Sequence, residues 1–424
     1  MTNQICIFED QYYRRLLPLV YTRPVYDLRC GILTLREKIQ RQYSSTKTSL
    51  HVRAYLADSL RQSNGSVSVN ALDEGGCLFL NGRLIAGREL SKQIPASGEE
   101  AIYVQGDVLI AARLRSNSRK VFDGKFPEAL KPSLFPGLPR TEVETKLINY
   151  PWDLIGKNGQ EIVSDFAVLS ATAQPRIKGV VYEGAHLVNK ENIIVGDGSK
   201  IKPGVVLDAE NGPIYIGNNV TVFPNAVIEG PAFVGDRTLI KAGAKIYENT
   251  SIGEVCKVGG EVEASIIHSY SNKQHDGFLG HAYLGQWVNL GADTNNSDLK
   301  NNYGTVKVVI DGVAVDSGSM FMGLVMGDHS KSSINSMFNT GTVVGVSSNV
   351  FGSGFPPKYV PSFSWGGSDN LTTYDPERAL LVASRVMGRR KIELSEVDRT
   401  MLKAVFEMTR TERTSLHGNS EKEN

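Results

Sequence analysis

The stretch IGNNVTVFPNAVIEGPAFVGDRTLIKAGAKIYENTSIGEVCKV, residues 216–258, repeats one feature every six residues. A branched aliphatic side chain recurs at this spacing without a miss, at Ile216, Val222, Ile228, Val234, Ile240, Ile246, Ile252 and Val258. A period of six fits neither an α-helix, which repeats every 3.6 residues, nor a strand, which alternates every two. It is typical of a solenoid whose short strands each turn one aliphatic side chain inward.

The same rhythm extends upstream and then fails downstream. Val195, Ile201 and Leu207 have the same spacing, before a slip at residues 211–213. After Val258 the period breaks, and it resumes at Leu284 and Leu290. The gap contains KQHDGFLGH, residues 273–281. We predict that the chain loops out of the solenoid here and re-enters at Phe278, which would free His275 to point into a cleft.

The segments on either side have a different character. An apolar run at residues 5–8, helical spacing over 28–43 and two further strand patterns at 77–85 and 101–114 predict an α/β domain. Proline-rich residues 122–140 are expected to form a loop. Residues 375–408 are typical of a helix pair, with Asp375 as N-cap and Pro376 in the first turn. The predicted domains are therefore an α/β domain at 1–175, a solenoid at 176–365 and a helical tail at 366–424.

Composition narrows the class of protein. The 424 residues carry a net charge of +1, with 41% hydrophobic and 21% charged residues, which is typical of a soluble globular protein. This charge argues against nucleic acid as a partner, and no apolar run reaches membrane-spanning length. The four cysteines are scattered without metal-ligand spacing, and the amino terminus has an acidic pair where a signal peptide would be apolar. We expect a cytoplasmic protein with no membrane partner.

The order of repeat, break and motif resembles a known family. The units IGNNV, IKAGA and VGGEV are similar to those of hexapeptide-repeat acyltransferases, which implies a left-handed parallel β-helix. HDGFLGHAYLGQWVNLGADT, residues 275–294, resembles the acetyltransferase motif of the bifunctional N-acetylglucosamine-1-phosphate uridyltransferase/glucosamine-1-phosphate acetyltransferase family. The resemblance implies acetyl-CoA as donor, an amino-sugar phosphate as acceptor, and a homotrimer in which neighbouring subunits complete each site.

The resemblance also implies roles for individual residues. His275 would be the general base, Asn289 would bind the acceptor, and the backbone of Ala292 would lie along acetyl-CoA. Lys241 stands where the family has an arginine for the sugar phosphate, and a lysine keeps the charge but loses the bidentate fork. Further phosphate candidates are Lys300 and Lys307, for which a solvated surface position is an equal alternative. His281 replaces an aspartate of the motif, and we expect a structural role for it.

The amino-terminal domain resembles sugar-phosphate nucleotidyltransferases in PLVYTRPVYDLRCGILTLREKI, residues 18–39. It departs from them at FEDQYYRR, residues 8–15, where a glycine-rich loop would wrap the triphosphate. Arg83 follows Asn81-Gly82, where a metal-binding aspartate is expected, and Asp107 is the candidate substitute. An active domain would require Mg²⁺. The residues expected to contact nucleotide are Arg14, Arg15, Arg23 and Asn81.

Three functional hypotheses remain open at this point. The first is acetyl-CoA-dependent N-acetylation of an amino-sugar 1-phosphate, with or without nucleotidyl transfer on the same chain. The second is an acyltransferase that acts on a sugar nucleotide, with a non-catalytic nucleotide-binding domain. The third is a non-catalytic oligomeric scaffold.

Overall fold

The computed structural model describes residues 2–116, 122 and 126–417, and contacts within the chain divide it into two compact units. Unit 1 comprises Met1–Leu28, Leu33–Tyr150 and Glu396–Met401, and unit 2 comprises Arg29–Ile32, Pro151–Ser395 and Leu402–Asn424. The division falls before α4 (Pro151–Leu169), which lies within the expected α/β domain but groups with the solenoid.

Unit 1 is built on a seven-stranded sheet with the order β3-β2-β1-β4-β6-β5-β7. The strands are β1 (Thr2–Phe8), β2 (Lys47–Leu50), β3 (Ser68–Val69), β4 (Gly76–Asn81), β5 (Ala101–Gln105), β6 (Val108–Leu114) and β7 (Arg140–Glu142). The first four strands are parallel to one another, and β6 is antiparallel to both of its neighbours. The α/β prediction is therefore confirmed.

Helices α1 (Leu35–Gln42), α2 (Ala57–Asn64) and α3 (Leu90–Gln93) connect the strands of unit 1. The helix expected over residues 28–43 begins only at Leu35, because Thr34 and Glu37 form a capping box that fixes its start. Phe8 and Phe79 lie in the core on one side of the sheet.

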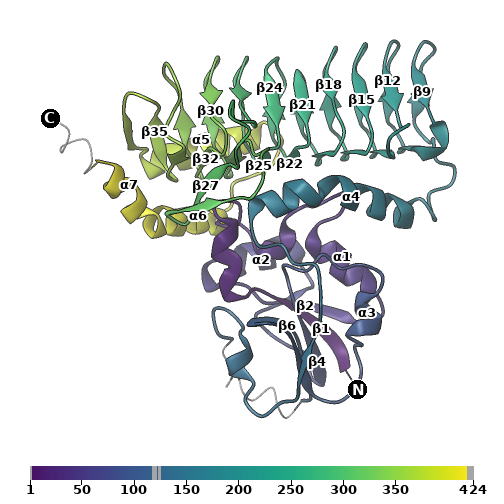
Figure 1. The fold of residues 1–424 in the computed structure, drawn as a ribbon, viewed down its shortest axis with the longest axis vertical. Helices are drawn as coiled ribbons and strands as arrows, with labels where there is room; N and C mark the ends of the chain where they lie inside the picture. Colours follow the sequence, from purple (N-terminus) through teal and green to yellow (C-terminus); the bar gives the residue numbers. More distant parts are fainter. Residues whose placement is uncertain (1, 117–121, 123–125, 418–424) are drawn as a thin grey trace. The chain divides into compact units, whose positions relative to one another are not determined.

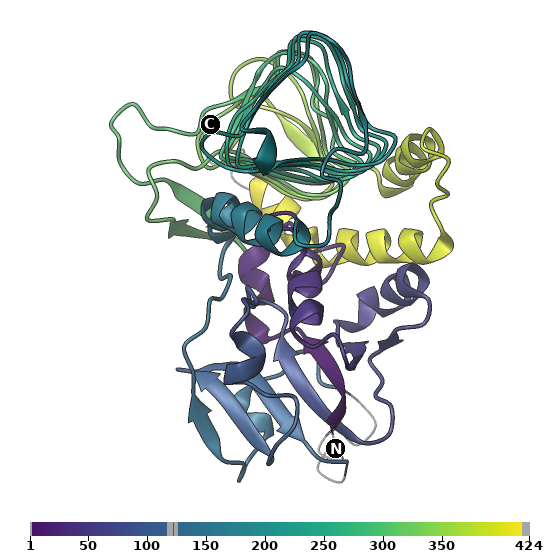
Figure 2. The same cartoon turned by 90° about the vertical axis from the view of Figure 1, so that its right-hand side faces the viewer.

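Unit 2 is a coil with three walls of stacked parallel strands, seen from the side in Figure 1 and along its axis in Figure 2. The first wall contains β10 (Ile193–Val195), β13 (Ile214–Ile216), β16 (Ala232–Val234), β19 (Thr250–Ile252), β22 (Ile266–Ser269), β25 (Tyr283–Gln286), β29 (Val325–Met326), β32 (Val343–Val344) and β34 (Tyr359–Val360).

The other two walls follow the same pattern. The second contains β8 (Val180–Val181), β11 (Lys200–Ile201), β14 (Thr221–Val222), β17 (Leu239–Ile240), β20 (Lys257–Val258) and β23 (Asn272–Lys273), then β30 (Lys331–Ser332), β33 (Asn349–Val350) and β35 (Ser364–Gly366), followed by β36 (Leu371–Thr373), which is antiparallel to β35. The third contains β9 (His186–Val188), β12 (Val206–Asp208), β15 (Val227–Glu229), β18 (Lys245–Ile246), β21 (Glu261–Glu263) and β24 (Phe278–Gly280), then β26 (Asn295–Asn296) and β31 (Met337–Phe338).

The six-residue aliphatic series forms the interior of this coil. Each of its members from residue 195 to 258 is buried in one continuous core cluster. Equivalent members of successive coils pair in register, as Val222 and Ile240 do between β14 and β17. The parallel β-helix of hexapeptide repeats is thus confirmed.

The predicted loop-out at KQHDGFLGH is wrong. Val258 pairs with Lys273 and Val262 pairs with Leu279, so the coil continues through this segment. The spacing of inward residues shortens earlier, from Val258 to Val262, because Gly259 and Gly260 form an abbreviated corner. From Lys273 to Leu279 the spacing is again six, but a lysine at the inward position hides the period.

The excursion from the coil comes later, between β26 and β29. It carries an antiparallel hairpin of β27 (Lys307–Ile310) and β28 (Val313–Asp316). Leu299 and Phe321 form a bridge at its base, and the coil resumes where Tyr283 pairs with Val325.

Helices flank the coil. Ile162 and Phe166 of α4 pack with Ile194 and Phe233 of the first wall. The carboxyl-terminal helices are α5 (Pro376–Gly388), α6 (Glu396–Met408) and α7 (Arg410–His417), and Asp375 caps α5 as predicted by accepting a hydrogen bond from the Arg378 amide. Among the described residues, none of the helices combines the length and apolar character needed to span a membrane.

Candidate functional site

A cleft of about 320 Å³ lies between the second wall of the coil and the end of α5, which runs beside the coil in Figure 2. One column of wall residues, Lys257, Asn272, Asn289 and Lys331, contributes to its lining. They lie in register because Lys257 pairs with Asn272, and bridges join Asn272 to Asn289 and Asn289 to Lys331. Stacked coils therefore place four polar side chains in a row, about 4.8 Å apart.

The end of α5 is fixed against this column. Arg390 donates a hydrogen bond from Nη2 to Oδ1 of Asn272 at 2.9 Å, and Asn272 donates in turn to Oδ1 of Asn289 at 3.3 Å. Arg389 and Val386 also line the cleft. Helix α5 thereby brings two guanidinium groups to the wall.

The cleft has a strong positive charge. Four of its lining residues are cationic and none is acidic; the cations are Lys257, Lys331, Arg389 and Arg390. Burial lowers the pKa of Lys257, and the nearby Arg390, Arg389 and Lys241 lower it further. Burial also lowers the pKa of Lys331 to about 8, while its Nζ donates to the carbonyl of His329 at 2.7 Å. Such an uncompensated cluster is suited to an anion with several charges.

An aromatic ladder forms one edge of the cleft. The rings of Tyr270 and Trp287 stack with their centroids 4.4 Å apart and an angle of 21° between their planes. His329 stacks on the other side of Trp287 at 6.1 Å. All three residues occupy the same coil corner with φ near +60°, which turns their side chains into one column. Tyr270 and Trp287 line the cleft and give it an aromatic surface next to its cations.

The structure brings together three of the predicted site residues. Asn289 lines the cleft, and His275 is exposed at the corner that follows β23, one residue beyond Gln274, which also lines the cleft. The pairing of Asn272 with Asn289 places His275 opposite Ala292 at the same corner of the next coil. The Asp293 amide donates to the Asp276 carbonyl at 3.1 Å across these corners.

The predicted lysines are distributed differently. Lys241 lies at the corner that carries Gln274, but two coils before it along the chain. Its Nζ is 5.3 Å from the centre of the Phe223 ring. It contributes to the electrostatic field on Lys257 without lining the cleft. Lys300 and Lys307 lie on the excursion, where Lys300 donates to the Thr305 carbonyl and Lys307 is exposed. Neither belongs to the cleft.

His281 has the surroundings of a structural residue. Its Nδ1 lies 2.8 Å from a carboxylate oxygen of Asp298, and its ring stacks on Phe321 at 4.9 Å. These contacts attach the base of the excursion to the coil.

In unit 1, the edge where a nucleotide would be expected is filled by ion pairs. Ligands of open α/β sheets bind at the carboxyl ends of parallel strands where the strand order reverses, which is here beside β1 and β4. Glu9, directly after β1, pairs with Arg53 at 2.9 Å, and Asp10 pairs with Arg83 at 2.6 Å. All four side chains are almost completely buried.

The residues predicted to contact nucleotide make contacts within unit 1 itself. The Asn81 amide donates to Asp10 and to the Leu109 carbonyl and accepts from the Arg83 amide, so its polar atoms are engaged within the core. Arg23 is buried and donates to the Leu19 carbonyl at 3.4 Å. Arg14 and Arg15 belong to the short 3-10 helix Gln11–Leu16, where Arg15 lies 4.3 Å from the centre of the Tyr12 ring.

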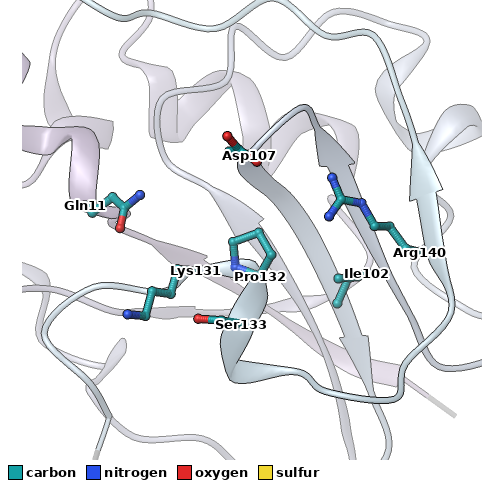
Figure 3. Close-up of a pocket in the computed structure, with 7 residues that line it drawn as sticks. All are labelled: Gln11, Ile102, Asp107, Lys131, Pro132, Ser133 and Arg140. Carbon is teal, nitrogen blue, oxygen red and sulfur yellow. The ribbon is translucent and has the colours of Figure 1, made fainter.

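A second pocket, of about 410 Å³, adjoins the β5–β6 turn (Figure 3). Asp107 is the one acidic residue of its lining, which also holds Lys131, Arg140 and Gln11. Mg²⁺ is held by carboxylates and other oxygen ligands, so a single carboxylate beside two cations does not fit it. In the described part of the chain, no group of three or more His, Cys, Asp or Glu side chains is arranged to hold a metal ion.

The sequence reading missed the cations and aromatics of the cleft. Arg389 and Arg390 follow α5, more than 100 residues after β23, and no pattern in the sequence connects the two. For Lys257 and Lys331 a signal existed, because both immediately precede an inward-facing position of the coil and therefore face outward on the same wall.

Comparisons with known proteins find a family model for the amino-terminal part of the chain and relatives that match part of its length. Residues 5–174 match the family model described as sugar nucleotidyl transferase. A bifunctional GlmU protein from Rippkaea orientalis is 29% identical over 160 residues, which cover 37% of this chain and 34% of the relative. A second, from Synechococcus elongatus, is 27% identical over 215 residues, covering 46% and 43%. The chain thus spans less than half the length of these relatives.

Among solved structures, a UDP-N-acetylglucosamine acyltransferase aligns over 52% of this chain and 79% of its own, at 17% identity and a TM-score of 0.29. Because this score is low, the alignment does not assign the fold. The assignment of the coil rests on the strand registers described above. Residues 5–174, less than half of the chain, are similar to the sugar nucleotidyl transferase family, and the chain is similar to bifunctional GlmU proteins.

Proposed function

We propose that the coil transfers an acetyl group from acetyl-CoA to the amine of an amino-sugar 1-phosphate, in the biosynthesis of nucleotide sugars. The observation that carries this proposal is the cationic cleft, which adjoins the corner where His275 and Ala292 lie on successive coils. Both substrates are phosphorylated, and the cleft offers four cations and no carboxylate. The GlmU relatives and the amino-terminal family match support the same area of metabolism.

The chemistry follows from the residues at the corner. The amine nitrogen attacks the thioester carbonyl, a C–N bond forms, the C–S bond breaks, and the thiolate of CoA leaves. His275, exposed and free to approach a ligand, takes the proton that the amine loses. Asn289 offers an amide to orient the acceptor, and the backbone at Ala292 offers a surface for the thioester arm.

The cleft residues would hold the charged parts of the substrates. Arg389 and Arg390 present guanidinium forks that match phosphate geometry, while Lys257 and Lys331 add point charges. The stacked rings of Tyr270 and Trp287, which line the cleft, supply an apolar surface beside the cations. We include a homotrimer and a cytoplasmic location in the proposal, and mass measurement of the native protein tests the trimer.

A thiol-release assay with acetyl-CoA tests the reaction. Free CoA should be released from acetyl-CoA when an amino-sugar 1-phosphate is the acceptor, but not when a sugar nucleotide is offered instead. The variant Arg390→Gln should raise the KM for a phosphorylated substrate about tenfold or more, since it removes one charge-assisted contact. Arg378→Gln, an exposed arginine on α5, the helix that precedes Arg390, is the matched control and should behave as wild type. Absence of thiol release with every acceptor would refute the acetyltransferase proposal and favour a scaffold.

One observation favours the second hypothesis in part. Two buried ion pairs fill the β1 and β4 ends of unit 1, residues 8–15 contain no glycine, and the described residues of this unit include no cluster of metal-ligating side chains. Thiol release with sugar nucleotides in place of amino-sugar phosphates would support an acyltransferase whose amino-terminal domain does not catalyse nucleotidyl transfer.

A further inference from the structure

Lys273 occupies a position that the coils on either side of it give to aliphatic residues. Along the second wall the inward residue is Val222, Ile240 and Val258 in successive coils, and Leu290 follows Lys273. Lys273 is 2% exposed, so its side chain lies within the coil. A lysine is almost never fully buried without a partner, because moving an ammonium group out of water is costly. Its presence therefore requires a specific contact.

That contact is with the corner that carries His275. The Lys273 Nζ donates to the carbonyl oxygen of His275 at 2.6 Å. The Lys273 side chain points into the coil, and its ammonium group binds the backbone carbonyl two residues further along the chain.

The neighbouring coil leaves room for this arrangement. A β-carbon added at Gly260 would lie 2.6 Å from Lys273 Nζ, 2.7 Å from the His275 carbonyl oxygen and 2.9 Å from that of Gly277. Gly260 also has φ +69°, a conformation that favours glycine. The absence of a side chain at this position lets the ammonium and the corner carbonyls meet.

Charges around the corner keep the ammonium protonated at neutral pH. Burial lowers the pKa of Lys273 to about 8, while Asp276, Asp293 and Glu261 oppose this shift. Asp276 lies at the same corner as Lys273, and Glu261 and Asp293 lie on the preceding and following coils. A charged donor makes a stronger hydrogen bond to a carbonyl than a neutral one does.

We propose that Lys273 is a positioning residue, which fixes the corner from inside the coil so that the His275 imidazole stays directed at the acceptor amine. This inference rests on the proposed function of His275. Small displacements of a catalytic group reduce the rate steeply, because the reacting atoms must be aligned. The coil wall alone does not supply this constraint, since the His275 carbonyl lies at a corner and receives its hydrogen bond from Lys273.

The test replaces the ammonium with an apolar side chain that the coil accepts elsewhere. Lys273→Met keeps the length of the side chain, and Lys273→Leu introduces the residue type of the next coil, so at least one variant should fold. We expect turnover to fall about 10- to 100-fold with little change in either KM. Hydrogen exchange of the peptide spanning residues 274–278 should become faster, while the melting temperature should stay the same or rise.

Two controls separate positioning from general damage. Val258→Ala removes bulk from the same interior column and should lower the melting temperature without this loss of turnover. Lys200→Met removes an exposed lysine from the same wall and should change neither measurement. Turnover that remains at the wild-type level in Lys273→Met or Lys273→Leu would overturn the inference, whether or not exchange at the corner changes.

Failure of the proposed function would look different. Wild-type protein without acetyl transfer, or full turnover in His275→Ala, would refute the catalytic assignment. The exchange measurement would still show whether Lys273 holds the corner: unchanged exchange in both Lys273 variants would overturn that contact too.

Discussion

Replacing Arg83 with methionine should destabilise unit 1 severely. The Arg83 side chain is fully buried and makes four hydrogen bonds: two to the Asp10 carboxylate at 2.9 and 2.6 Å, and one each to the Ile148 carbonyl at 2.9 Å and the Asn149 side chain at 2.8 Å. Methionine fills much of the same volume but donates none of these bonds. The Asp10 carboxylate would remain buried with only the Asn81 amide and the Tyr12 backbone amide as donors.

Removing one partner of a buried ion pair typically costs about 3–5 kcal/mol, because the other charge is left without compensation. We therefore expect the free energy of unfolding of unit 1 to fall by about that amount in Arg83→Met. Pulse proteolysis in increasing urea measures this unit separately from the coil. Lys92→Met removes one partner of the exposed pair with Glu89 and should cost less than about 1 kcal/mol.

A double variant, Asp10→Asn with Arg83→Met, checks the cause. If the cost comes from an uncompensated carboxylate, the double variant should be more stable than Arg83→Met alone, since an asparagine has no charge to bury. A loss below about 1 kcal/mol in Arg83→Met would refute the reasoning and would return this edge of the sheet to consideration as a ligand site.

Three further predictions concern activity. His275→Ala should lower turnover ~10²–10⁴-fold, the usual cost of losing a general base, with acetyl-CoA affinity and melting temperature unchanged; a wild-type rate in steady-state assays would remove the assignment. The Lys331 ammonium is charged below its pKa of about 8 and neutral above it, so the KM for acetyl-CoA should rise as the pH passes 8 in the wild type. In Lys331→Met that KM should be higher and should vary less over the same range, and identical profiles would exclude Lys331 from binding. Magnesium-dependent pyrophosphate release by wild-type protein should be weak or absent, and rates like those of ordinary pyrophosphorylases would contradict the description of unit 1.

The periodic part of the fold could be predicted from sequence because its physical cause is local. Each wall of each coil must bury one aliphatic side chain, so the six-residue spacing of the series Ile216 to Val258 follows directly from the length of one wall and its corner. The interpretation failed where that rule was broken, at the shortened corner of Gly259 and Gly260 and at Lys273. A charged residue at an inward position looks like a gap in the pattern, although the backbone continues undisturbed.

The candidate site was predictable only in part, for a similar reason. The likeness of a continuous motif pointed to His275, Asn289 and Ala292, and stacking of adjacent coils then places them together. The cations from the end of α5 reach the cleft through tertiary packing across a long stretch of chain, which no local pattern records. In unit 1, the residues after β1 suggested an altered loop, but pairing of Glu9 and Asp10 with arginines from other strand ends is also a tertiary feature.

The excursion between β26 and β29 suggests that this fold could serve as a carrier for foreign peptides. Tyr283 and Val325 are neighbours in the first wall although a long segment of chain separates them, and Leu299 meets Phe321 at the neck of that segment. Beyond the neck, β27 contacts β32 of the first wall, and Val306 and Val308 are buried, whereas Gly312 at the tip of the hairpin has open space around it. Since the entropic cost of closing a loop rises slowly with its length, a longer insert could be placed at this tip. Such a graft would leave the stacked coils, and whatever they bind on the second wall, in their present register.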